Sequence, residues 1–201
     1  MPEPKLLIAS TNPGKVAEYR LLLEGLGMEI VGPEALEREI PPFAETGASF
    51  RENAAAKAGH WHAHSGLPVL ADDSGLAVDS LDGAPGVYSA RFAGPRATDQ
   101  QNVARLLERL REVKKPSRGA TFHCCLALCR SDDSLVFFEG ICRGEILTLP
   151  AGTSGFGYDP VFYYPPLAKT FAQLSPAKKN QVSHRALALK AFRNWLASNQ
   201  I

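Results

Sequence analysis

The sequence predicts a mixed α/β fold, in which a β-sheet is flanked by helices. Short apolar segments typical of strands alternate with stretches whose apolar residues recur at helical spacing. Two further strand-like segments are joined by a polar turn, which is typical of a hairpin and not of a purely parallel sheet. The 201 residues, 45% of them hydrophobic, suffice for a substantial core. No repeat or linker interrupts the chain, so we expect a single domain spanning residues 1–201.

The first third of the chain predicts a strand, a helix, a strand and a second helix. An apolar run at 5–9 precedes a polar turn, and a helix follows whose apolar positions include Val16, Tyr19 and Leu23. Residues 28–31 predict a short strand, and the Pro-containing segment up to residue 42 predicts a loop. The second helix is expected to begin near Thr46 or Ser49, where Ser49 and Glu52 have the spacing of a capping box, and to end near residue 64.

The next segments predict an interrupted strand and a third helix. Residues 67–71 are apolar, residues 72–75 read Asp-Asp-Ser-Gly, and residues 76–78 are apolar again. Carboxylates within a buried strand are costly unless they have a partner or a function. After a turn-rich segment, Thr98 is the expected N-cap of a helix and Gln101 has the capping-box position.

The last third of the chain predicts a hairpin, a strand and a helical C-terminal segment. Residues 121–129 and 135–142 are expected to pair antiparallel around the turn at 131–134. A Gly-rich loop at 152–160 leads into a strand at 161–164. Residues 175–196 show a helical apolar stripe, and the pattern leaves open whether the helix breaks at Ser183.

Charge and composition exclude several classes of protein. The formal net charge of +1 offers no field that would hold a nucleic acid or an anionic membrane. No apolar run approaches the roughly 20 residues of a membrane-spanning helix, and the N-terminus has no signal-peptide pattern, so we expect a soluble cytoplasmic protein. The four cysteines form no Cys-x-x-Cys pair and are interpreted as buried thiols in a reducing compartment. A small-molecule ligand remains the best candidate partner.

Residues 10–15 (Ser-Thr-Asn-Pro-Gly-Lys) form the first segment with chemical potential. Hydroxyls, backbone N–H groups at a helix start and one lysine are what a phosphate requires. The Walker pattern is absent, because Ala9 and Val16 stand where it needs Gly and Ser or Thr. An ordinary turn explains this segment equally well on its own.

The carboxylates Asp72 and Asp73 form the second candidate group. Adjacent carboxylates after an apolar run suit a hard cation such as Mg²⁺, which uses few protein ligands and otherwise water and phosphate. Glu45, Asn53 and Lys57 add a carboxylate, an amide and an ammonium on or near the second helix. The competing interpretations are a solvated turn for the aspartates and an exposed polar stripe for the other three.

The third and fourth groups suit a nucleoside. Phe156 lies between two glycines, so that the backbone can approach a flat ligand while the ring stacks on it. Lys179 and the segment 183–185 (Ser-His-Arg) bring donors to a possible helix start, although a solvated basic helix would look the same. His60 and His64 are one helical turn apart, but without a third ligand they are interpreted as a solvated helix end and not as zinc ligands.

Taken together and in order, these motifs resemble the inosine triphosphate pyrophosphatase family over nearly the whole chain. The matching segments are Ser10–Lys15, Glu45–Gly47 with Asn53 and Lys57, Ala71–Leu76, Gly83–Arg91, Gly155–Pro160 and Ser183–Arg185. The resemblance implies a two-lobed mixed α/β fold with a twisted sheet, an active-site cleft between the lobes and a homodimer. It implies Mg²⁺-dependent hydrolysis of ITP, dITP and XTP to the monophosphate and pyrophosphate, which keeps deaminated purines out of DNA and RNA.

The resemblance also implies a role for each matched residue. Asp73 would accept a proton and Lys57 would assist catalysis, while Asp73, Asp72 and Glu45 would bind the metal. Some relatives carry two acidic residues before the Thr-Gly, whereas this chain has Ala44 and Glu45 and so offers one carboxylate there. The substrate would be bound by Ser10, Thr11, Asn12, Pro13, Gly14, Lys15, Ser74, Phe156, Gly157, Tyr158, Asp159, Lys179, His184 and Arg185.

Physical chemistry agrees with these roles and suggests a basis for selectivity. Hypoxanthine and xanthine have a carbonyl acceptor at C6 where adenine has an amino donor, so Arg185 or a backbone N–H could donate only to the former. No residue that would exclude guanine is evident. Three alternatives stay open: a triphosphatase for another altered nucleotide such as a modified pyrimidine, a nucleotide sensor without catalysis, and a zinc enzyme built on His60 and His64.

Overall fold

The computed structural model describes residues 4–36, 39–114 and 117–199. Its α-helices are α1 (Pro13–Leu22), α2 (Phe50–Ser65), α3 (Asp99–Arg109), α4 (Pro176–Val182) and α5 (His184–Leu196). Its strands are β1 (Lys5–Ile8), β2 (Glu29–Val31), β3 (Val69–Val78), β4 (Gly119–Cys129), β5 (Leu135–Ile146), β6 (Phe162–Tyr164) and β7 (Lys169–Thr170). In the described part of the chain these strands form one sheet in the order β2-β1-β3-β4-β5-β6-β7, so the predicted mixed α/β class is confirmed.

The chain divides into two compact units. Unit 1 comprises Met1–Asp73, Cys124–Gly140 and Ala186–Ile201, and unit 2 comprises Ser74–His123 and Ile141–Arg185. The chain therefore passes from one unit to the other within β3, β4, β5 and α5. The interpretation of residues 1–201 as a single domain stays a prediction.

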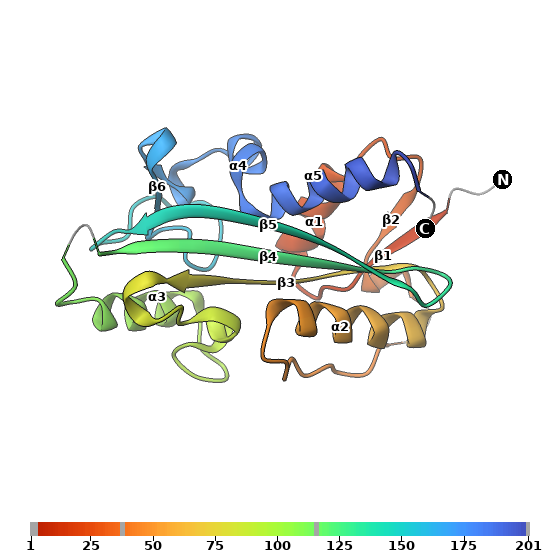
Figure 1. Ribbon diagram of the computed structural model, residues 1–201, viewed down its shortest axis with the longest axis horizontal. Coiled ribbons are helices and arrows are strands. Elements are labelled where there is room, and N and C mark those ends of the chain that lie inside the picture. The colour runs from red at the N-terminus through yellow and green to blue at the C-terminus, as the bar shows by residue number, and fades with distance from the viewer. Residues whose placement is uncertain (1–3, 37–38, 115–116, 200–201) are drawn as a thin grey trace. The chain divides into compact units, whose positions relative to one another are not determined.

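In unit 1, helices cover both faces of the strands. β1 pairs in parallel with β2 and with β3, as a strand-helix-strand sequence predicts. One apolar cluster joins Leu6 and Leu70 to residues of α1 and α5, and a second joins Leu7 and Ala71 to residues of α2. Figure 1 accordingly shows α1 and α5 on one side of these strands and α2 on the other. Because neighbouring strand residues face opposite sides, each strand here contributes to both clusters.

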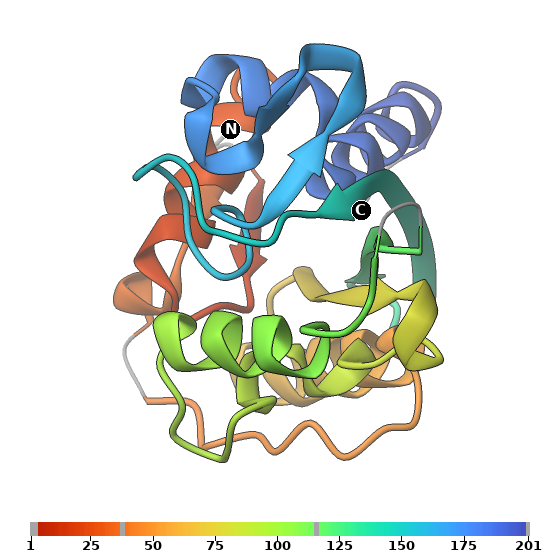
Figure 2. The ribbon, with the colours of Figure 1, turned by 90° about the vertical axis from the view of Figure 1, so that its left-hand side faces the viewer.

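Unit 2 has an apolar core, to which α3 contributes Val103 and Leu106 and its C-cap contributes Leu110. Figure 2 shows α3 in green and the segment with β6 and α4 in light blue. The buried Arg118 donates to the main-chain carbonyls of Leu110 and Val113 beyond α3 and of Ile146 and Leu147 at the end of β5. This guanidinium therefore satisfies carbonyls that a helix end and a strand end leave unpaired.

The structure confirms the predicted helix caps with one difference. At α3, Thr98 and Gln101 form the complete capping box. At α2, the Ser49 hydroxyl accepts the Glu52 N–H, but the Glu52 carboxylate accepts the N–H of Ala48 and not that of Ser49. The second bond of the box is thus moved by one residue.

Three further findings refine the predicted elements. β3 runs unbroken from Val69 to Val78, so both aspartates lie in mid-strand. The C-terminal helical segment breaks at Ser183, whose extended backbone (φ −71°, ψ 156°) ends α4 before α5 begins. The four cysteines are free and buried, as predicted, and burial raises the pKa of Cys125 to about 11 and of Cys142 to about 12.

Candidate active site

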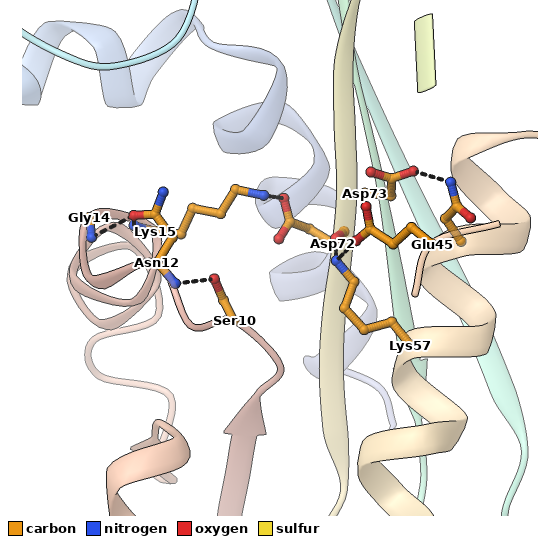
Figure 3. Close-up of polar contacts among 9 residues, drawn as sticks. Ser10, Asn12, Gly14, Lys15, Glu45, Lys57, Asp72 and Asp73 are labelled. Carbon is orange, nitrogen blue, oxygen red and sulfur yellow. Dashed lines mark hydrogen bonds and ion pairs between the residues drawn. The ribbon is translucent and has the colours of Figure 1, made fainter. Parts of the chain in front are cut away.

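The alternation of β3 sends its two aspartates to opposite faces of the unit 1 strands. Leu70 packs with the α1 and α5 cluster and Ala71 with the α2 cluster. Because residues two apart in a strand share a face, Asp72 faces the same side as Leu70, and Asp73 faces the same side as Ala71. Figure 3 shows Asp72 turned toward Lys15 at the start of α1 and Asp73 on the side of α2. Their exposed fractions are only 2% and 6%. Burial of this kind requires partners, and both carboxylates have them.

The Asp72 carboxylate is paired with the phosphate-loop candidate. Lys15 Nζ lies 2.8 Å from Asp72 Oδ2, and the lysine side chain stays about a fifth exposed. Within the loop, Asn12 Oδ1 accepts the N–H groups of Gly14 (2.9 Å) and Lys15 (3.2 Å) and thereby caps α1. Two amides that the sequence offered to a phosphate are therefore used by the cap, and the cationic group of this loop is the ammonium of Lys15.

The other residues of the loop flank this lysine. The Asn12 N–H donates to the Ser10 hydroxyl at 3.2 Å, Ser10 is buried and Thr11 is exposed. Pro13 is the first residue of α1, where its missing N–H costs no hydrogen bond; its side chain lies outside the described part of the structure. The sequence-predicted loop thus exists as a capped helix start with one cation.

The Asp73 carboxylate lies against α2. The side-chain amide of Asn53 donates to Asp73 Oδ2 at 2.9 Å. Burial raises the pKa of Asp73 to about 6; the Asn53 hydrogen bond acts against this shift, and the charge of Glu45 adds to it. A carboxylate with a pKa near neutrality can take a proton from water during a reaction, which a carboxylate of ordinary pKa does poorly.

Lys57 on α2 lies between the carboxylates. Its ammonium forms an ion pair with Glu45 and donates to the main-chain carbonyl of Asp72 at 2.7 Å. Burial works to lower the pKa of Lys57, but the charges of Asp72 and Glu45 outweigh it and hold that pKa above its usual range. Lys57 is therefore a fixed cation that can offset negative charge, and it is not a base.

The oxygen donors of this group fit a magnesium ion bound jointly with a substrate. Glu45 and Asp72 both act electrostatically on Asp73, so three carboxylates share one region of unit 1. Among residues 4–36, 39–114 and 117–199, however, no three His, Cys, Asp or Glu side chains are arranged as a complete metal cluster. Mg²⁺ typically takes one or two protein carboxylates and completes its shell with phosphate and water. The residues present fit that mode of binding and do not form an all-protein cage.

Unit 2 contains the second group of predicted site residues, around Phe156. The buried Asp159 carboxylate accepts the Phe156 N–H at 3.0 Å and pairs with Lys179 Nζ at 2.5 Å. Burial raises the pKa of Asp159 against the attraction of Lys179. A Cβ on Gly155 would lie 2.0 Å from Asp159 Oδ2, and its φ is +79°, so both space and backbone require glycine there. The Asp159–Lys179 ion pair thus fixes the main chain of this loop at Phe156.

Cations face the Phe156 ring. Lys179 Nζ lies 4.6 Å and Arg185 Cζ 5.5 Å from its centroid. His184 stacks on Phe122 with centroids 4.6 Å apart, and both His184 and Arg185 are buried at the first residues of α5. The Tyr158 hydroxyl donates to the Ser89 carbonyl at 2.8 Å, which makes this tyrosine a structural support.

The structure adds a residue that the sequence did not reveal. Asp99, the first residue of α3, accepts the Gly157 N–H at 2.6 Å. A cavity of about 580 Å³ is lined by α3 and this loop, with Asp99, Gln100 and Phe156 among its walls. In sequence, Asp99 is indistinguishable from an ordinary acidic residue of a first helical turn. Ser74 follows Asp73 in β3 and is half-buried.

The histidines near the end of α2 do not form a metal site. His60 Nε2 lies 2.9 Å from the Pro41 carbonyl, and His64 Nδ1 lies 2.7 Å from the His60 carbonyl. The described residues supply no third ligand. Throughout the described residues, every helix is too short or too polar to span a membrane.

Comparison with known proteins gives consistent matches along the chain. Residues 6–195 match the profile of the Ham1 family. The dITP/XTP pyrophosphatase of Yersinia pseudotuberculosis is 50% identical over 188 residues, which cover 92% of this chain and 94% of the relative. The corresponding protein of Halalkalibacterium halodurans is 45% identical over 191 residues, covering 94% and 97%.

Solved structures agree with the sequence comparison. A HAM1 protein from Coxiella burnetii has a TM-score of 0.89 and 40% identity, covering 98% of this chain and 100% of that one. A nucleoside-triphosphatase described as a dITP/XTP pyrophosphatase, from Mycobacterium abscessus, has a TM-score of 0.76 and 44% identity, covering 94% and 98%.

Proposed function

This chain belongs to the Ham1 family, and from that premise we propose that it is a nucleoside triphosphate pyrophosphatase acting on deaminated purine nucleotides. Its substrates are dITP, XTP and ITP, which it cleaves between the α- and β-phosphates to give the monophosphate and pyrophosphate. The names of its relatives support dITP and XTP; ITP follows because it carries the same base as dITP.

The observation that carries this proposal is the pairing of a proton-accepting carboxylate with fixed cations in unit 1. Asp73, with its pKa raised to about 6, accepts the proton of the water that attacks the α-phosphorus. Lys57 is held cationic, and together with Lys15 it offsets the charge that develops on the phosphates and the leaving pyrophosphate. Because both lysines already lie against Asp72, they need little rearrangement to meet a polyanion.

We assign the metal to the same carboxylates. Asp73, Asp72 and Glu45 would hold Mg²⁺ together with phosphate oxygens, and Glu45 would exchange its ion pair with Lys57 for the metal. When bound, the ion would supply Lewis-acid stabilisation of the phosphate charge and would make the attacking water more acidic. The Ser10–Lys15 loop and Ser74 would bind the phosphates and the adjoining part of the substrate.

The base would be recognised by the Phe156 region of unit 2. Phe156 offers a ring for stacking, and Arg185 is the donor best suited to the C6 carbonyl of hypoxanthine and xanthine. The N–H groups of Phe156 and Gly157 are engaged by Asp159 and Asp99, so they do not compete for this carbonyl. A buried donor left unpaired by adenine rejects it by factors of up to about 10⁴. Gly157, Tyr158, Lys179 and His184 complete this region.

The assembly and location of the protein belong to the same proposal. We assign it a homodimer, with Tyr88, whose side chain is 59% exposed, as a candidate contact on the 3₁₀ segment Gly86–Arg91. We assign it to the cytoplasm, because its four cysteines are free thiols, as in a reducing compartment.

The test is a substrate panel with product identification. The purified protein is incubated with ITP, dITP, XTP, ATP, GTP and a modified pyrimidine triphosphate, with Mg²⁺ or with a chelator. Pyrophosphate released from the deaminated purines only, and only with Mg²⁺, is the expected result, and Asp73→Asn should abolish it. Orthophosphate as product, turnover of the pyrimidine alone, or binding without turnover would each overturn the proposal.

A further inference from the structure

Asn53 occupies an unusual place in unit 1, because it is a polar side chain with only 1% of its surface exposed and it contacts a proposed catalytic group. We propose that Asn53 is a positioning residue of the reaction. It acts through Asp73 and through the segment that carries Glu45, and it does not touch the substrate. This inference rests on the proposed function of Asp73 as the proton acceptor.

One end of the Asn53 amide fixes the orientation of Asp73. Its Nδ2 group donates to Asp73 Oδ2 at 2.9 Å within a buried environment. Rotation of a carboxylate about its Cβ–Cγ bond is otherwise a soft degree of freedom, with a broad distribution of angles. The hydrogen bond therefore determines the plane of the carboxylate and assigns Oδ2 to the protein. A proton acceptor held in one orientation loses less entropy on reaching the transition state.

The other end of the amide anchors the preceding loop. Asn53 Oδ1 accepts the N–H of Gly47 at 2.7 Å. A Cβ on Gly47 would lie 2.7 Å from this oxygen and 2.9 Å from the Cβ of Glu52, so only glycine allows the loop to approach so closely. Glu45 stands two residues before Gly47 and pairs with Lys57. A single amide thus links the orientation of Asp73 to the position of the Glu45 segment.

The chain contains a matched control for this arrangement. Asn102 stands four residues after the N-cap of α3, as Asn53 does after the N-cap of α2, and it is 2% exposed. Its amide also bridges two partners, donating to the Ala90 carbonyl at 3.1 Å and accepting the Ala93 N–H at 2.9 Å. Both partners of Asn102 are main-chain groups. The difference between the two asparagines is therefore the Asp73 carboxylate.

The first experiment compares Asn53→Ala with Asn102→Ala in steady-state kinetics with dITP. Loss of a supporting hydrogen bond to a reactive side chain costs activity by about 10- to 100-fold, so we expect kcat of Asn53→Ala to fall by that factor while KM stays within about threefold. Both variants lose the two hydrogen bonds of a buried side chain, so Asn102→Ala should lower the melting temperature about as much as Asn53→Ala does. The kcat of Asn102→Ala should stay within about threefold of that of the wild type. Equal kcat losses in both variants, or unchanged kcat in Asn53→Ala, would overturn the inference.

A nearly isosteric variant covers the case in which Asn53→Ala does not fold. Asn53→Asp keeps an oxygen for the Gly47 N–H and, once ionised, presents a carboxylate oxygen to Asp73 in place of the donor. Its kcat is compared with that of the wild type at pH 9, because a proton shared by the two carboxyls at lower pH would restore a donor. It should therefore lose kcat at least as strongly as the alanine variant while the loop stays anchored. A kcat of Asn53→Asp equal to that of the wild type would refute an orienting role.

The second experiment needs no activity. Melting temperatures are measured in chelator for Asn53→Ala, Asp73→Ala and the double variant, and the same cycle is run with Asn102→Ala in place of Asn53→Ala. Contacting residues are non-additive, whereas distant ones add. We expect the first double variant to depart from the sum of its single shifts and the second to match it. Additive shifts in the first cycle contradict the inference even if the enzyme is active. If the shifts are non-additive but the wild type hydrolyses no substrate, the proposed function has failed, and with it the catalytic part of this inference.

Discussion

Replacing Asp73 with asparagine should stabilise the metal-free protein near pH 8 while abolishing its activity. Burial raises the pKa of Asp73 from 3.8 to about 6, which means that the folded protein resists ionising this carboxyl. Between these two pKa values the folded state binds more protons than the unfolded chain, so stability decreases as the pH rises from about 4 through 6. Above about pH 7 the full cost of the buried charge is present. A neutral amide at this position removes that cost.

The size of the effect follows from the shift itself. A difference of about two pKa units corresponds to about 3 kcal/mol, because each unit is worth about 1.4 kcal/mol. For a chain of this length, that free energy raises the melting temperature by about 6–12 °C. The side-chain oxygen of asparagine can still accept the hydrogen bond from Asn53, so this buried donor keeps an acceptor after the substitution.

The assay is thermal unfolding in chelator at pH 8 and at pH 4.5, with activity measured in parallel. Asp73→Asn should melt higher than the wild type at pH 8, and the difference should shrink markedly at pH 4.5. Asp132→Asn is the control, because Asp132 is exposed and its pKa is lowered, chiefly by hydrogen bonds from Ser134, so its substitution should not stabilise at pH 8. An Asp73→Asn variant that melts at or below the wild type at pH 8, or gains equally at both pH values, would refute the reasoning.

Three other predictions test separate parts of the structure. Lys15→Ala should raise KM for dITP at least about tenfold, with a smaller effect at high salt, since Lys15 supplies a point charge for the phosphates; an unchanged KM at both salt concentrations would contradict the phosphate role. Arg118→Met should destabilise the fold by about 3 kcal/mol or more in denaturant unfolding, because four main-chain carbonyls, those of Leu110 and Ile146 in buried contacts, lose their donor. Lys179→Met should cost about 3–5 kcal/mol by leaving the buried Asp159 carboxylate without its ion-pair partner, and adding Asp159→Asn should recover part of this loss.

Local patterns were sufficient to predict most elements of this fold. The apolar spacing of α1 and α3, the N-caps Ser49 and Thr98 and the polar hairpin turn depend on residues close together in the chain. The family motifs also indicated the groups at Asp73 and Phe156 from sequence alone. These features are local, so one sequence contains all the information they require.

Long-range hydrogen bonds could not be predicted in the same way. The contact of Asp99 with Gly157 joins residues 58 positions apart, and no local pattern separates Asp99 from any acidic residue of a first helical turn. The carbonyls that Arg118 satisfies lie on two other elements, and the amides used by the Asn12 cap became evident only from geometry. The break at Ser183 likewise depends on the backbone ψ angle of this residue, whereas the apolar pattern continues on both sides of it and so does not indicate the break.

The unbroken alternation of β3 also limits how this protein can change in length. Asp72 and Asp73 face opposite sides because they stand three and four residues after Val69 in a strand whose side chains alternate between its two faces. Losing one residue before them would exchange their faces. Lys15 would then meet the wrong carboxylate and Asn53 would lose its acceptor. Substitutions along β3 can be graded in their effect, whereas a one-residue insertion or deletion between Val69 and Asp72 acts on both carboxylates at once. The parity of a single strand is in this sense as much a part of the active site as the side chains it carries.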